Sequence, residues 1–219
     1  MASPVYNIVH NNTFWLSAQR CIFWEQQQAL IVSDLHLGKT GHFRKMGIAV
    51  PQAVYKEDLQ RLFSEIQFYK PKQLIIVGDL FHSHENKEMQ LFVKWRTDLS
   101  YINMTLVKGN HDILKNDWYA QAGIHIVEQQ LCIENFIFTH DAEAVNCTGV
   151  SDPFVFSGHI HPGVVIKGVG RQALTFPCYH FSKTGAIIPA FSKFTGVYIT
   201  HKKPDDKVFA IVNQSVISV

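Results

Sequence analysis

The sequence contains no long apolar run, no leader-like segment and no paired cysteines. No stretch approaches the roughly eighteen consecutive apolar residues that a membrane-spanning helix needs. The first residues lack the basic region, apolar run and small-residue cleavage site of a signal peptide. The four cysteines are widely separated, which argues against a zinc ribbon or a disulfide framework. These absences predict a cytoplasmic protein with no membrane span, in which the thiols stay reduced.

The chain also lacks a strong charge imbalance and any sign of modular organisation. Its formal net charge of +2 is too small for a global field that would favour nucleic acid or a membrane surface. Binding of a polyanion would therefore depend on local groups of basic residues. The sequence has no internal repeat, no low-complexity tract and no linker rich in proline, glycine and serine. We therefore expect a single domain over residues 1–219.

Hydrophobic patterning predicts alternating strands and helices in the first half and mostly strands in the second. Amphipathic periodicity indicates helices over 51–69 and 85–99, with a short helix near 115–122. From residue 124 onward the strand-like segments are IHIVE, CIENFIFTH, FVFSGHIH, GVVIKG, ALTFP, GVYIT and KVFAIV. Apolar strands without alternation, such as LIIV, indicate sheets that are buried on both faces. A two-sheet sandwich flanked by helices fits this order, and the last segment, KVFAIVNQSVISV, could pair within the sheet or across a dimer.

Histidine is abundant, with 12 residues, and five apolar strands are followed closely by histidine, aspartate or asparagine. These strand ends carry Asp34 and His36 after ALIVS, Asp79 after LIIVG, Asn110 after TLVKG, His140 after FIFT, and His159 and His161 after FVFSG. Gly78, Gly109 and Gly158 precede three of them, and glycine permits a close approach of backbone and site. Ligands bind at the carboxyl ends of strands in open α/β sheets. Each strand end alone could be a turn or a buried histidine, but five together predict one site.

These seven side chains offer nitrogen and oxygen donors without a thiolate. Such a set suits Mn, Fe, Zn, Co or Ni better than Mg or Ca, which prefer oxygen ligands. Seven ligands exceed the capacity of one tetrahedral site and suit two metal ions that share a bridging carboxylate. Two ions roughly 3.5–4 Å apart can bind a bridging hydroxide and clamp a phosphate during an in-line displacement. The sequence therefore predicts a phosphoesterase with two divalent metal ions, for which we expect manganese while Fe, Zn, Co and Ni remain open.

The series DLHLG, GDLFH, GNHD, TH and GHIHP resembles the calcineurin-like metallophosphoesterase superfamily, whose motifs are DxH, GD, GNH[DE], H and GHxH. The resemblance extends over nearly the whole chain, and none of the motifs is missing. It implies an α/β fold, a four-layer sandwich of two central mixed β-sheets flanked by helices. It also implies two sets of metal ligands that share Asp79 as the bridge. These sets are Asp34, His36, Asp79 and His161 for one metal, and Asp79, Asn110, His140 and His159 for the other.

The same resemblance gives His111 a catalytic role, since the corresponding histidine does not ligate metal in such enzymes. Its side chain would lie beside the phosphate and stabilise the transition state or help protonate the leaving oxygen. The neighbouring Asp112 could orient His111. Alternatively, Asp112 could be the N-cap of a helix that begins at residue 113.

Other segments resemble a small bacterial branch of phosphoesterases and endonucleases that are associated with a DNA ligase and a helicase in the DNA-damage response. These segments are DLHLGKTGHFRKMGIAVP, GDLFHS with FVKWR, GHIHPG and IIPAFSKFTG. The branch implies a DNA substrate, and Lys39, Arg44 and Lys45 could contact its phosphates. His82 stands where purple acid phosphatases have a metal-binding tyrosine, so no iron–tyrosinate chromophore is expected. His82 and His84 could reach the rim of the cleft, although a surface-loop position is favoured.

Three alternatives remain open at the level of sequence. The motif DLHL also opens the UDP-2,3-diacylglucosamine pyrophosphatases, but those carry a helical lid, and the only room for one here is residues 82–101. A generic phosphodiesterase acting on small molecules is the second alternative. The third is an inactive scaffold, against which stands the presence of every expected ligand and of His111. Oligomeric state and the preference between DNA and RNA are not predicted.

Overall fold

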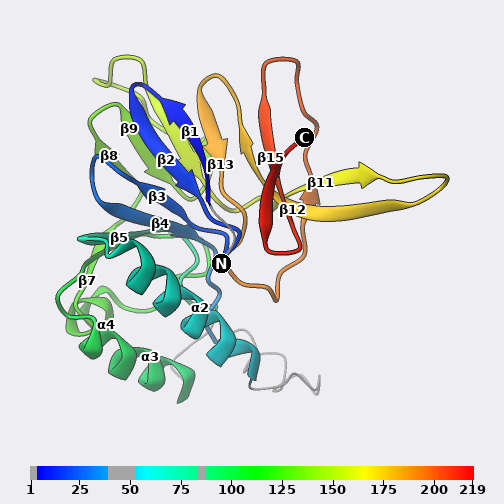
Figure 1. Ribbon diagram of the computed structural model, residues 1–219. Coiled ribbons are helices and arrows are strands. Elements are labelled where there is room, and N and C mark those ends of the chain that lie inside the picture. Colours follow the sequence, from blue (N-terminus) through cyan, green and yellow to red (C-terminus); the bar gives the residue numbers. More distant parts are fainter. Residues whose placement is uncertain (1–3, 39–52, 83–86) are drawn as a thin grey trace.

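The computed structural model describes residues 4–38, 53–82 and 87–219, and these residues form two β-sheets that pack face to face (Figure 1). The first sheet has seven strands in chain order. They are β1 (Val5–Val9), β2 (Asn12–Leu16), β3 (Ile22–Trp24), β4 (Ala29–Ser33), β5 (Gln73–Val77), β6 (Asn103–Val107) and β7 (Ile124–Val127). Strands β1 to β4 form an antiparallel meander, whereas β4 to β7 are parallel. The parallel strands are connected through α2 (Ala53–Tyr69), α3 (Lys87–Asp98) and α4 (Asn116–Gln121), as parallel pairing requires.

The second sheet has nine strands, and its centre is the parallel trio β9–β10–β13. Its strands are β8 (Gln130–Ile133), β9 (Phe136–Thr139), β10 (Phe154–Ser157), β11 (Pro162–Lys167), β12 (Ala173–Phe181), β13 (Gly185–Ile187), β14 (Tyr198–Ile199), β15 (Lys207–Val212) and β16 (Ser215–Ser218). A short 3-10 helix, η1 (Ala142–Ala144), follows β9. The hairpin β11–β12 projects from the body of the molecule (Figure 1).

Two hydrophobic cores hold these layers together. One lies between the first sheet and the helices, where Leu62 of α2 and Phe92 of α3 pack against strands β4 to β6. The other lies between the sheets and is largely aromatic, with Phe14 and Trp24 facing Phe136 and Phe156. The predicted pair of central mixed sheets is therefore confirmed. The described α-helices all pack on the outer face of the first sheet (Figure 1).

Most predicted elements are present, and the differences concern the strand-rich half. The segment CIENFIFTH is not one strand but the hairpin β8–β9, which turns at Glu134 with a positive φ of 53°. Strand β13 was not expected. The last segment pairs within the sheet as the hairpin β15–β16, and β15 also pairs with β12. Among the described residues, no helix is long and apolar enough to cross a membrane.

Candidate metal centre

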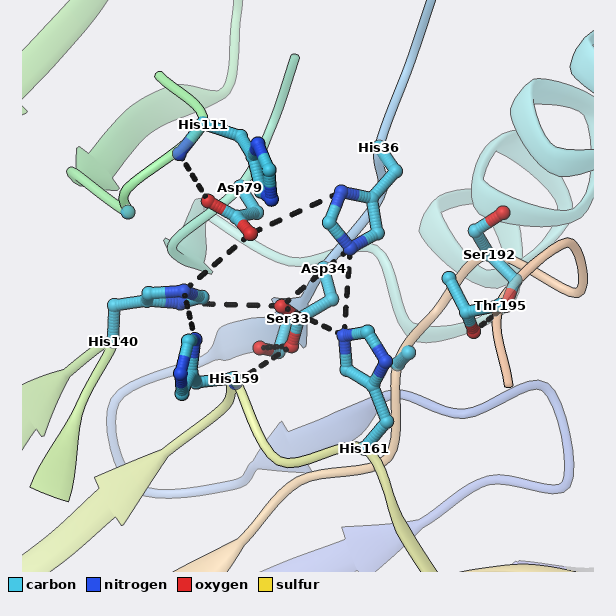
Figure 2. A network of polar contacts seen from close by, with 12 residues as sticks. Ser33, Asp34, His36, Asp79, His111, His140, His159, His161, Ser192 and Thr195 are labelled. Carbon is cyan, nitrogen blue, oxygen red and sulfur yellow. Dashed lines mark hydrogen bonds and ion pairs between the residues drawn. The ribbon is translucent and has the colours of Figure 1, made fainter. Parts of the chain in front are cut away.

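The five predicted strand ends meet at one place between the two sheets. In the first sheet, β4, β5 and β6 are parallel neighbours, so their carboxyl ends lie at the same edge. In the second sheet, β9 and β10 are also parallel neighbours. The side chains that follow these strands point toward one another (Figure 2). The structure thus brings together all seven residues predicted as ligands, Asp34, His36, Asp79, Asn110, His140, His159 and His161.

One group of potential ligands consists of Asp34, His36 and His161. The Asp34 Oδ1 atom lies 3.2 Å from His161 Nε2 and 3.9 Å from His36 Nε2. The two histidine Nε2 atoms are 3.4 Å apart. Three ligand atoms that converge on so small a space are in a suitable arrangement to share one cation.

The second group consists of Asp34, Asp79 and His140, so that Asp34 belongs to both. His140 Nε2 lies 3.4 Å from Asp79 Oδ2, 3.0 Å from Asn110 Oδ1 and 3.2 Å from His159 Nδ1. The same Asp79 Oδ2 atom is 3.9 Å from His36 Nδ1. Asp79 therefore faces a histidine of each expected ligand set, which is the position that a bridging carboxylate needs, while Asp34 also lies between the two groups.

Five of the seven residues have a left-handed backbone, which non-glycine residues rarely adopt. Their φ values are 53° for Asp34, 47° for His36, 53° for Asp79, 66° for His159 and 53° for His161. This conformation costs on the order of 1 kcal/mol or more at each residue. Such a concentration at one place indicates that packing holds these turns in the geometry that the site requires.

The glycine before each of three ligands is required by a close approach. A Cβ atom on Gly78 would overlap the ring of His140, and one on Gly109 would overlap the Asp79 carboxylate. A Cβ on Gly158 would overlap Ser33 Oγ and the carboxylate of Asp34. The prediction that glycine makes room for the site at these positions is confirmed.

Replacing Gly158 with alanine is therefore expected to lower the melting temperature by several degrees and to reduce metal uptake. The added methyl group would displace Ser33 and Asp34, and overpacking of this kind costs about 1–3 kcal/mol. Thermal unfolding and metal analysis after dialysis against manganese would measure both effects. Gly196→Ala is the matched control, because no atom of the described residues lies within 4 Å of its added Cβ. An unchanged melting temperature and metal content in Gly158→Ala would contradict this packing argument.

Asp79 and His140 shift each other's pKa in opposite directions. Burial acts to raise the pKa of Asp79, but its hydrogen bond and charge interaction with His140 outweigh burial and hold the pKa at about 2. Burial acts to lower the pKa of His140, but the hydrogen bond that its ring donates to Asp79 and the charges of Asp34 and Asp79 raise the pKa to about 9. A cation that binds through His140 therefore competes with the proton that the neighbouring carboxylates favour on this ring.

His111 lies at the edge of the centre beside a second histidine. Its backbone N–H donates to Asp79 Oδ1 at 2.9 Å, which fixes the loop against the carboxylate. Its ring lies with its centroid 4.2 Å from that of His82 and 5.6 Å from that of His36. His82 therefore belongs to the centre rather than to a remote surface loop. Its position three residues after Asp79 was the only signal for this in the sequence.

Of the two roles predicted for Asp112, the structure excludes the helix N-cap, and the carboxylate contacts backbone groups of the loops that follow β6 and β5. Its carboxylate accepts hydrogen bonds from the backbone N–H of Gly109 at 2.9 Å and of Phe81 at 3.1 Å. Helix α4 begins only at Asn116 and has Lys115 as its N-cap, so Asp112 is not an N-cap. Burial raises the pKa of Asp112 to about 7. The side chain ties the loop after β6 to the loop after β5, and it thereby supports His111 through the backbone.

Two features of the centre were missed by sequence reasoning. Ser33 hydrogen-bonds with Asp34 Oδ2, which also accepts the backbone N–H of His159 at 3.2 Å. The segment around Phe191 lies across the end of β4, where the N–H groups of Phe191 and Ser192 donate to the carbonyls of Ser33 and Asp34. The contacts of His159, Phe191 and Ser192 have no local signature, since each joins residues that are far apart in the sequence.

A hollow of about 300 Å³ opens beside Asn110, His140 and His159. Lys108 lines it and pairs with Glu128 at 3.3 Å, so this basic side chain stands next to the centre. The predicted substrate contacts Lys39, Arg44 and Lys45 lie outside the described residues, as does His84.

The donor set fits divalent cations. Asp34 is fully buried, yet its Oδ1 atom accepts no hydrogen bond from any described residue while it faces three histidine rings. A buried carboxylate oxygen without a donor is costly, and a cation would satisfy it. Imidazole nitrogen and carboxylate oxygen without thiolate are the ligands of Mn, Fe, Zn, Co or Ni sites.

Comparison with known proteins agrees with this chemistry. A family model described as calcineurin-like phosphoesterase matches residues 28–167. This match covers more than half of the chain, which therefore belongs to the calcineurin-like phosphoesterase family and is a metal-dependent phosphoesterase. No curated protein sequence matches the chain significantly.

Solved structures include one close match in fold. The crystal structure of Pseudomonas putida nuclease MPE is 25% identical, has a TM-score of 0.82, and the match covers 99% of this chain and 100% of that chain. The phosphoesterase Yfce from E. coli is 15% identical, with a TM-score of 0.45 over 87% of this chain and 97% of that chain. A protein of unknown function from Aquifex aeolicus is 16% identical, with a TM-score of 0.44 over 61% and 78% of the two chains.

Proposed function

We propose that this phosphoesterase is a nuclease with two metal ions, which cleaves phosphodiester bonds of DNA in the cytoplasm as part of DNA repair. The observation that carries the proposal is the convergence of seven nitrogen and oxygen ligands in two overlapping groups. The whole-length likeness to a nuclease, at 25% identity, supports nucleic acid as the substrate. A DNA ligase and a helicase are the repair partners that the sequence resemblance implies.

Asp34, His36, Asp79 and His161 would hold one metal ion, and Asp79, Asn110, His140 and His159 would hold the other. We propose manganese as the resident metal, with Fe, Zn, Co or Ni as alternatives that suit the same donors. When bound, two such ions lower the pKa of water to supply a nucleophile and neutralise charge on the phosphate oxygens.

The remaining tasks fall to side chains of the protein. His111 would donate a proton to the leaving oxygen of the phosphodiester, or a hydrogen bond to a phosphate oxygen. His82 would keep the His111 ring in place, since the two rings are in contact. Asp112 would position His111 by accepting hydrogen bonds from the backbone N–H groups of Phe81 and Gly109, which hold the loop that carries His111. Lys39, Arg44 and Lys45 would contact the DNA phosphates.

The alternative substrates find less support in the described residues. A pyrophosphatase acting on a UDP-lipid would need an apolar lid in the region after β5, but α3 buries Met89 and Phe92 in the core beneath the first sheet. A scaffold without activity is disfavoured because the ligand set is complete. A small-molecule phosphodiesterase would use the same metal chemistry, and only its choice of substrate would differ.

A substrate panel tests the proposal. The protein, supplemented with manganese, is assayed on single-stranded DNA, duplex DNA, bis(p-nitrophenyl) phosphate and a UDP-lipid, with a chelator as the control. We expect cleavage of DNA and of the small diester, and loss of both with the chelator. Hydrolysis of the UDP-lipid without cleavage of either DNA would overturn the assignment in favour of the pyrophosphatase. Metal analysis of protein purified without chelators identifies the resident ion.

A further inference from the structure

One long segment of the chain has no acidic residues. Residues 153–204 contain six basic residues and no aspartate or glutamate, although about four acidic residues would be expected there from the average over the chain. The rest of the chain carries 14 of the 20 basic residues and all 18 acidic ones, so it is net negative. The net charge of +2 is therefore the sum of +6 in this segment and −4 in the rest of the chain. A segment of this kind has the charge that complements a polyanion.

This acid-free segment begins at the metal centre and leads away from it. It contains His159 and His161, and β11 starts directly after His161. The hairpin β11–β12 then projects beyond the body of the molecule (Figure 1). Strand β14 pairs with the base of this hairpin, where the N–H of Tyr198 donates to the carbonyl of His161 at 2.9 Å. Lys167 and Arg171 near the tip are exposed and form no ion pair with any described residue.

One face of the projecting part carries a row of large apolar side chains. Opposite residues on paired strands share a face, and Ile166 pairs with Leu174, Val164 with Phe176, and Pro162 with Tyr198. The resulting apolar row consists of Val164, Ile166, Leu174, Phe176 and Tyr198. Leu174 is 64% exposed and Tyr198 is 68% exposed. Soluble proteins rarely leave such a row open to water without a binding role.

The same face continues into a cavity next to the metal centre. Side chains alternate along β12, so that His180 lies on the face of Leu174 and Phe176, and it lines a cavity of about 710 Å³ together with Tyr198. The segment around η1 separates this cavity from the hollow beside the metal centre, because Ala142 lines the cavity and Ala144 lines the hollow. The volume is in the range of sites that accept small organic groups.

The acidic side chains at the cavity are already paired. Asp152 lies 3.5 Å from His10, and Asp206 accepts a hydrogen bond from His180 at 2.8 Å. His180 also lies 2.8 Å from Thr200 Oγ1 through its other ring nitrogen. The two carboxylates are thus engaged, His201 and Lys203 also line the cavity, and the remaining wall is mainly apolar, with Val155, Ala186 and Ile187 among its residues.

We propose that this face, from the cavity to the tip of the β11–β12 hairpin, binds the single-stranded nucleic acid chain that flanks the cleaved phosphate. The apolar row and the cavity receive unstacked bases. Arg171 lies in the turn at the tip, and Lys167 follows Ile166 on β11 and so points to the opposite face. These two side chains contact phosphates where the nucleic acid chain passes round the tip. Apolar and aromatic surfaces bind bases only when these are exposed, which holds for a single strand and not for a duplex. The inference rests on the proposed nuclease function, since it names the form of substrate that the metal centre acts on.

Binding of a short fluorescent single-stranded DNA oligonucleotide, measured by anisotropy with a chelator present, tests the surface apart from catalysis. Tyr198→Ala is expected to weaken binding about tenfold, whereas Tyr198→Phe, which keeps the ring, binds like the wild type. The double variant Lys167→Ala/Arg171→Ala is expected to weaken binding and to reduce the slope of log K against log salt by about 1.4, or roughly 0.7 for each lost phosphate contact. Lys56→Ala/Lys94→Ala on α2 and α3 is the matched control. Hydrolysis of bis(p-nitrophenyl) phosphate should be unchanged in all of these variants.

The outcomes separate this inference from the nuclease assignment. If the wild-type protein cleaves DNA but the Tyr198 and Lys167/Arg171 variants bind it normally, the inference fails and the nuclease function stands. If wild-type protein binds no oligonucleotide with the chelator present, the inference fails as well. If no nucleic acid is cleaved under any condition, the nuclease function itself is wrong. Sedimentation provides a further check, because a wild-type dimer that Tyr198→Ala converts to a monomer would identify the face as a contact between two copies of the chain.

Discussion

Replacing Asp79 with asparagine is expected to reduce hydrolysis of bis(p-nitrophenyl) phosphate to the background rate, a loss of at least about a thousandfold. Its Oδ2 atom faces His36 at 3.9 Å and His140 at 3.4 Å, so that the substitution removes a charged ligand from both proposed metal sites. Asparagine has nearly the same shape and tolerates the left-handed backbone that Asp79 adopts with φ 53°. The variant therefore tests charge and ligation with little change to the turn. Metal content per chain should fall together with activity.

Asp206→Asn is the matched control for this experiment. Asp206 is also a buried aspartate with a histidine partner, His180, but it lies outside the metal centre. It should keep its metal and hydrolyse the small diester at the normal rate. Thermal unfolding of both variants shows whether they are folded. A folded Asp79→Asn protein that retains two metal ions and full activity would remove the basis of the bridging role.

Changing His111 to asparagine or glutamine is expected to give the second largest loss, of about two to four decades in the rate on DNA. The metal content should not change, because His111 contributes its backbone N–H to the Asp79 carboxylate and its side chain is not one of the seven ligands. The loss should be much smaller on bis(p-nitrophenyl) phosphate, since nitrophenolate leaves without the help of a general acid. The comparison of the two substrates therefore identifies proton donation to the leaving oxygen.

Two further variants make this test specific. His125→Gln changes an exposed histidine on β7 and should have no effect. His82→Gln removes the ring that contacts His111, and it should lower the rate on DNA by less than the His111 variants do, because it acts through the position of His111. Equal rates on DNA for the wild type and both His111 variants would show that the leaving oxygen takes its proton from another source.

Local sequence was sufficient to predict the strands that carry the site. Strands such as β4 and β5 are uninterrupted apolar segments, and the polar residue that follows each of them marks the carboxyl end. Glycine at positions 78, 109 and 158 was correctly predicted to allow site residues to approach the backbone closely. Predictions were weaker in the second half, where β8 and β9 were taken as one strand. The turn was indicated only by the polar pair Glu134 and Asn135 within an otherwise apolar segment, and this short interruption was not interpreted as a turn.

Other features could not be predicted, because they depend on contacts between distant residues. Ser33 was missed although it precedes Asp34, since its role follows from hydrogen bonding with the carboxylate and from the approach of Gly158. Asp112 was assigned to its neighbours in sequence, but it binds the backbone of Phe81, 31 residues away. The absence of acidic residues from 153–204 can be counted in the sequence. That this segment also carries a row of apolar side chains on one face follows only from the register of β11, β12 and β14.

The sequence by itself determined which chemical groups the protein possesses and in which order strands present them, because strand periodicity and residue type are local properties. It therefore determined the family and the donors available for a metal. Only the tertiary structure decided which donors lie close enough together to hold a cation, that His82 lies against His111, and that the apolar row shares a face with the cavity. Those relations join residues as far apart as Asp34 and His161, and they exist only once parallel strands of two sheets bring their ends to the same edge.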